Sequence, residues 1–69
     1  MLTITKKNKA SLQFAYMNPH VFKHVAAVEG ITKEQSDEVA EKLKAVYGDD
    51  WFRFFIALKP ATLNAKIGA

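Results

Sequence analysis

The most informative segment of the chain is residues 30–48, which read GITKEQSDEVAEKLKAVYG. Thr32 and Gln35 have the T-x-x-Q spacing of a capping box, in which each side chain hydrogen-bonds the other residue's backbone N–H. A single apolar stripe follows at helical spacing, formed by Val39, Leu43, Val46 and Tyr47. Gly48 supplies a stop, because glycine commonly ends helices. The segment therefore predicts a helix over residues 32–47.

A second helix is predicted immediately upstream. Asn18 and Pro19 form a start signal, because Asn caps helices well and Pro at the first helical position loses no needed hydrogen bond. The apolar stripe of this helix would consist of Val21, Phe22, Val25 and Val28. Gly30 ends it just before the cap at Thr32, so the connection is short and the two helices must pack as a unit.

A third helix follows, and it is unusually apolar. Asp49 or Asp50 can cap it, and Pro60 limits it to about Leu58 or Lys59, since the residue before proline disfavours helical backbone. Apolar side chains point in nearly every direction around it, namely Trp51, Phe52, Phe54, Phe55, Ile56, Ala57 and Leu58. A helix that is apolar all round is normally buried, yet a domain this small has little interior. We therefore expect either the N-terminal segment or a partner to cover its outer side.

The first 17 residues permit two structures. Leu2–Thr5 alternates in polarity, as do residues 11–16, and with the intervening lysine-rich bend this pattern indicates a β-hairpin. The same residues permit a helix over 9–17 capped by Asn8, and we favour this helix.

The whole chain is predicted to be one domain, residues 1–69, with flexible ends at 1–8 and 68–69. Its 69 residues, 49% hydrophobic and 25% charged, have the composition of a globular protein. We expect an all-α fold of three to five short helices, with residues 61–67 adding a last helical turn. The alternative is an α+β fold, with an N-terminal β-hairpin packed on three helices.

The sequence carries no sign of export or of a membrane span. The longest apolar run, Phe54–Leu58, is five residues, against the roughly 20 that a spanning helix needs. The N-terminal apolar residues precede the first lysines, the reverse of the order in a signal peptide. The chain has no cysteine, which excludes disulfides and thiol chemistry. We expect a cytoplasmic protein without a membrane partner.

Residues 25–32, VAAVEGIT, lead into the helix over 32–47 and resemble a helix-turn-helix, in which a small residue four places before a turn glycine lets two helices approach closely. The matching positions are Ala26, Gly30, Ile31 and Val39. Glu29 and Ser36 depart from the pattern, which has apolar residues at both places. The second helix also carries four acids that the phosphates of DNA would repel, Glu34, Asp37, Glu38 and Glu41.

Little in the sequence points to catalysis or metal binding. His20 and His24 are spaced i, i+4, which lets two imidazoles reach one metal, but two ligands do not make a site. Ser11 and Ser36 have no recognisable base nearby, and capping explains Asp49 and Asp50. We expect no enzymatic activity, no metal and no cofactor.

Charge is segregated along the chain. Residues 1–24 hold four lysines and no acid, residues 25–50 hold three lysines against seven acids, and residues 51–69 hold one arginine and two lysines. If the two basic ends converge in the fold, they form a positive patch opposite an acidic helix. A nucleic-acid-binding protein of the helix-turn-helix type would use Lys6, Lys7, Lys9, Lys23, Lys59 and Lys66.

The preferred hypothesis is a non-enzymatic adaptor or inhibitor that binds another protein. Small stand-alone proteins of bacteria and their phages often act in this way on a host macromolecular machine, which is an analogy. Aromatic residues and arginine favour buried interfaces, so we expect the aromatic helix to provide the contacts, or to pair two copies as a homodimer. The predicted partner-binding residues are Trp51, Phe52, Arg53 and Phe55, with the acidic face Glu34, Asp37, Glu38 and Glu41 as a second surface. An acidic helix can also imitate nucleic acid toward a basic protein.

Overall fold

The computed structural model describes residues 2–21 and 30–68, and the described part is helical without a strand. Its α-helices are α1 (Lys6–Met17), α3 (Lys33–Tyr47), α4 (Trp51–Ala57) and α5 (Pro60–Ile67). Two short 3₁₀ helices, η1 (Pro19–Val21) and η2 (Gly48–Asp50), follow α1 and α3. The predicted all-α class is therefore confirmed, and the α+β alternative is wrong.

Helix α1 begins earlier than the sequence predicts. Its N-cap is Thr5, whose hydroxyl accepts a hydrogen bond from the Asn8 backbone N–H at 3.1 Å. In return the Asn8 side chain accepts one from the Thr5 N–H at 2.7 Å, so Asn8 is the second member of a capping box and not the cap itself. The hairpin is excluded because the backbone N–H groups of residues 9–17 are paired within a helix.

The capping box predicted at the start of α3 is confirmed. The Thr32 hydroxyl accepts from the Gln35 N–H at 3.0 Å, and the Gln35 side chain accepts from the Thr32 N–H at 2.9 Å. The helix ends at Tyr47, and Gly48 follows with a φ of +70°. The apolar stripe is buried at Val39 and Leu43, but Val46 is exposed. Ser36, which departs from the helix-turn-helix pattern, is buried together with this stripe. Its hydroxyl group donates a hydrogen bond to the Lys33 carbonyl.

The proline after the aromatic helix both ends α4 and begins α5. Asp50 occupies the N-cap of α4, as predicted, but its side chain makes no capping hydrogen bond. Leu58 and Lys59 are extended, and Pro60 is the first residue of α5. The single last turn predicted for residues 61–67 is a full helix that starts one residue earlier.

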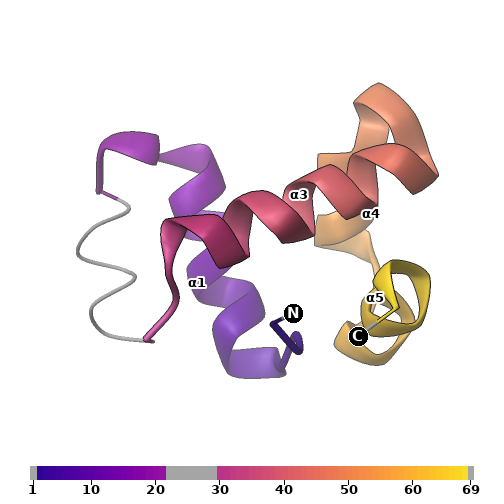
Figure 1. Cartoon of the computed structure of the whole chain (residues 1–69), viewed down its shortest axis with the longest axis horizontal. Helices are drawn as coiled ribbons and strands as arrows, with labels where there is room; N and C mark the ends of the chain where they lie inside the picture. The colour runs from indigo at the N-terminus through magenta and orange to yellow at the C-terminus, as the bar shows by residue number, and fades with distance from the viewer. Residues whose placement is uncertain (1, 22–29, 69) are drawn as a thin grey trace.

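A single core cluster joins all four α-helices. Its completely buried side chains are Phe55, Leu12, Leu43, Leu63 and Val39, and Ile4, Ile31 and Ile67 complete it. Figure 1 shows α3 running across the molecule in front of α1 and α4, with α5 beside one end. Helix α3 contacts both α4 and α5.

The upstream helix of the predicted pair lies mostly outside the described residues. Its expected start at Asn18 and Pro19 coincides with the start of the 3₁₀ helix η1 at Pro19, and Gly30 has the positive φ, +67°, expected of a helix exit. Phe22 to Glu29 are not described, so the predicted stripe and the helix-turn-helix pairing stay predictions. None of the described helices has the length and apolar character needed to cross a bilayer.

Candidate functional site

The inner face of the aromatic helix α4 packs against Tyr16 of α1. The Tyr16 ring meets Trp51, Phe55 and Phe52 edge-on, with centroid distances of 5.3, 5.6 and 6.2 Å. Phe55 is completely buried, while Trp51 and Phe52 are half-buried. The N-terminal segment thus covers one side of α4, and Phe55 is a core residue that does not reach the surface.

Tyr16 also ties α1 to α3 through its hydroxyl group. This hydroxyl donates a hydrogen bond of 2.7 Å to the Ser36 carbonyl. Burial of the phenol raises the pKa of Tyr16 above its ordinary value, and the negative charge of Asp37 raises it further. The side chain therefore works as a neutral donor between two helices.

The remaining predicted partner-binding residues are on the surface. Arg53 is exposed and forms an ion pair of 3.6 Å with Asp50. The four acids of α3, here called the acidic face, are also exposed: Glu34, Asp37, Glu38 and Glu41. Asp37 pairs with Lys33 at 2.9 Å, and this contact holds the pKa of Lys33 above its ordinary value.

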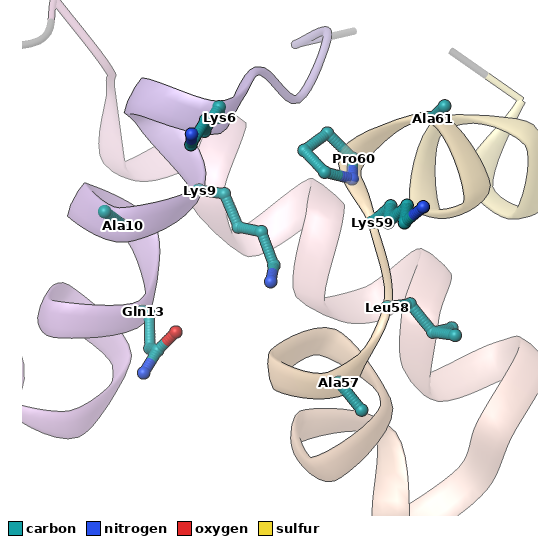
Figure 2. A pocket seen from close by; sticks show the side chains of 9 residues that line it. All are labelled: Lys6, Lys9, Ala10, Gln13, Ala57, Leu58, Lys59, Pro60 and Ala61. Atoms are coloured by element: carbon teal, nitrogen blue, oxygen red, sulfur yellow. The ribbon is translucent and has the colours of Figure 1, made fainter.

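An open cleft lies between α1 and the connection from α4 to α5, and we call it the lysine cleft. It has a volume of about 680 Å³. Its walls are shown in Figure 2, and they consist of Lys6, Lys9, Ala10, Gln13, Ala57, Leu58, Lys59, Pro60 and Ala61. Three of these residues are lysines, five are apolar and none is acidic. The cleft therefore combines a positive charge with an apolar surface.

Lys9 is fixed on the wall of this cleft. Its Nζ donates a hydrogen bond of 3.0 Å to the Ile56 carbonyl and lies 5.8 Å from the centre of the Phe55 ring. Ile56 belongs to the last turn of α4, where carbonyl groups have no partner within the helix and attract a cation. Lys9 is half-buried, whereas Lys6 and Lys59 are exposed and free to meet a ligand.

The cleft brings together half of the six lysines predicted for nucleic-acid binding. Lys6 and Lys9 come from the basic N-terminal part of the chain and Lys59 from the basic C-terminal part. Lys7 and Lys66 are exposed but do not line the cleft, and Lys23 lies outside the described residues. The lysines alone could be suspected from the two basic blocks. The apolar walls carry no sequence signal, because alanine, leucine and proline are common everywhere.

The lysine ammonium groups of the cleft are suited to binding an anionic group. Among the described residues, no three His, Cys, Asp or Glu side chains are grouped to hold a metal ion. His20 is exposed in η1, and His24 lies outside the described residues.

In comparisons with known proteins, no family model matches the chain, and neither a curated protein nor a solved structure is significantly similar to it.

Proposed function

We propose that this chain is a non-enzymatic binding protein that recognises an acidic segment of another protein in the lysine cleft. The observation that supports the proposal is the composition of the cleft walls, which contain three lysines and five apolar residues and no acid. A peptide with carboxylates and small apolar side chains would satisfy both parts of this surface.

The shape and lining of the cleft favour a peptide over a nucleic acid. Proteins read duplex DNA mainly with elements that protrude into a groove, whereas this surface is hollow. Single strands are usually held by stacking of their bases on exposed aromatic rings. None of the nine lining residues is aromatic. A nucleic acid would therefore use the lysines and leave the apolar walls without a matching partner.

The expected affinity is modest and salt-dependent. Exposed ion pairs contribute only about 0.2–1 kcal/mol each, and salt screens them further. Lys6 and Lys59 are exposed, so the apolar contacts with Leu58, Pro60 and their neighbours must supply much of the remainder. We expect a peptide that combines acidic and apolar residues to bind more tightly than a purely acidic peptide of equal charge.

The test uses two double variants with the same net charge. Lys6→Glu with Lys59→Glu reverses charge inside the cleft, and Lys7→Glu with Lys66→Glu reverses it outside. Binding of a fluorescent peptide that alternates Glu and Leu is followed by anisotropy at low and near-physiological salt. We expect the first variant to lose binding by at least tenfold and the second to keep most of it. Equal losses in both would show that only net charge matters and would contradict the proposal.

Random-sequence duplex DNA in the same titration tests the nucleic-acid hypothesis. The observation in its favour is that the exposed lysines at positions 7 and 66 add positive charge outside the cleft. If this hypothesis is correct, DNA binds more tightly than the peptide, and reversing the charges at Lys7 and Lys66 weakens DNA binding as well.

A further inference from the structure

We propose that the lysine cleft also accepts the acidic face of α3 from a second copy of this chain, so that the protein associates with itself head to tail. This inference rests on the proposed function, because both partners would occupy the same cleft. The acidic face is part of the molecule itself, and its negative charge complements the lysines of the cleft.

The acidic face has the geometry of a docking ridge. Glu34, Glu38 and Glu41 follow one another at helical spacings of four and three residues, so their Cα atoms span about 10 Å along one side of α3. The buried residues Val39 and Leu43 lie on the opposite side of the helix. The three glutamates are exposed, and the ion pairs found among the described residues involve Asp37 and Asp50 instead. Their carboxylates are therefore available to a neighbouring molecule.

The two surfaces point in opposite directions. In Figure 2 α3 runs behind the cleft, and its buried side faces the helices that form the cleft. The acidic face is on the far side of α3, so one copy cannot fill its own cleft. Contact between two unlike surfaces does not form a two-fold dimer, and it builds closed rings or open chains according to the rotation between neighbouring copies.

This association is expected to be weak and easily displaced. It depends on exposed charges, which salt screens over about 10 Å at 0.1 M ionic strength. An acidic partner peptide would compete for the cleft and return the protein to monomers. A partner would therefore have to bind the cleft more tightly than the second copy does in order to displace it.

A charge-swap experiment by sedimentation velocity tests the inference. The first variant carries Glu38→Lys and Glu41→Lys, which makes the acidic face positive. The second carries Lys6→Glu and Lys59→Glu, which makes the cleft negative. Each variant alone would confront like charges and should stay monomeric, whereas an equimolar mixture restores opposite charges at every contact and should associate. Lys7→Glu with Lys66→Glu is the control that keeps the wild-type behaviour, and circular dichroism verifies that all variants are folded.

The outcomes separate this inference from the proposed function. Association of wild-type protein at low salt and of the mixture, but of neither variant alone, would support it. Wild-type protein that stays monomeric up to millimolar concentration at low salt would overturn it. If that monomer still binds the Glu-Leu peptide through Lys6 and Lys59, only the self-association is wrong. If it binds neither partner, both proposals are wrong.

Discussion

At the scale of single residues, the Asn64 side chain forms hydrogen bonds with the backbone of Ile4, close to the N-terminus. Its side-chain oxygen accepts from the Ile4 N–H at 2.7 Å, and its side-chain nitrogen donates to the Ile4 carbonyl at 2.8 Å. Ile4 is buried in the core, so its backbone groups have little access to water. One amide from α5 thus holds a segment that is 60 residues away in the chain.

We predict that Asn64→Ala lowers the free energy of unfolding by about 1–3 kcal/mol, because two backbone groups of Ile4 lose their partner. Urea unfolding followed by circular dichroism measures the change. Asn18→Ala is the matched control, since the Asn18 amide makes one exposed hydrogen bond of 3.2 Å. Equal losses in the two variants would show that the Asn64 amide has no special role.

Tyr16 is expected to make the folded protein less stable at alkaline pH than at neutral pH. Its pKa is raised by burial, so the folded protein holds the phenolic proton more tightly than the unfolded chain does. The stabilisation is complete below the unfolded tyrosine pKa of about 10 and declines as the pH rises above it.

We predict that Tyr16→Phe reduces this alkaline loss and lowers stability at neutral pH by about 1 kcal/mol, the usual value for one hydrogen bond. Urea unfolding at neutral pH and above the tyrosine pKa measures both effects. Tyr47→Phe, which keeps Tyr16, should retain the alkaline loss. An unchanged pH profile in Tyr16→Phe would assign that loss to other groups.

At the scale of elements, the end of α3 depends on one glycine. Gly48 has φ +70° and ψ −146°, a combination that other residues scarcely adopt. A Cβ added there would meet nothing within 4 Å, so the requirement comes from the backbone and not from crowding. Gly68 ends α5 with φ +77° and ψ 25°, a left-handed conformation that costs other residues less.

We therefore predict that Gly48→Ala destabilises the protein by about 1–3 kcal/mol and that Gly68→Ala has a smaller effect. Thermal unfolding of both variants provides the comparison. A larger loss for Gly68→Ala would mean that fraying at the end of α5, and not the turn into η2, limits stability.

At the scale of the whole molecule, one small core supports every helix. Phe55 is its largest completely buried side chain, and the neighbouring Ile56 is 43% exposed. Removing a buried phenylalanine costs about 3–5 kcal/mol, a large part of the stability of a domain of this size.

We predict that Phe55→Ala largely unfolds the protein, whereas Ile56→Ala changes its melting temperature little. Circular dichroism distinguishes the two results. A folded Phe55→Ala protein that fails to bind a partner would instead support the interface role predicted from the sequence.

Local signals in the sequence were sufficient to predict most of the helix ends. The capping box of Thr32 and Gln35, the stop at Gly48 and the break before Pro60 each act within a few residues, so no distant contact is needed to recognise them. The start of α1 was misplaced because Thr5 alternates with apolar neighbours as a strand residue would. The pairing of Asn8 with Thr5 then overrides that pattern.

Only the tertiary structure determined which side of α4 is buried and where the basic residues meet. A helix with apolar residues on nearly every side has no preferred face until Tyr16 packs against Trp51 and Phe55. The cleft likewise exists only because α1 and the connection before α5 meet across the core supported by α3. The buried side of α4 and the location of the cleft result from packing between segments that are distant in the sequence. Local sequence patterns therefore cannot predict them.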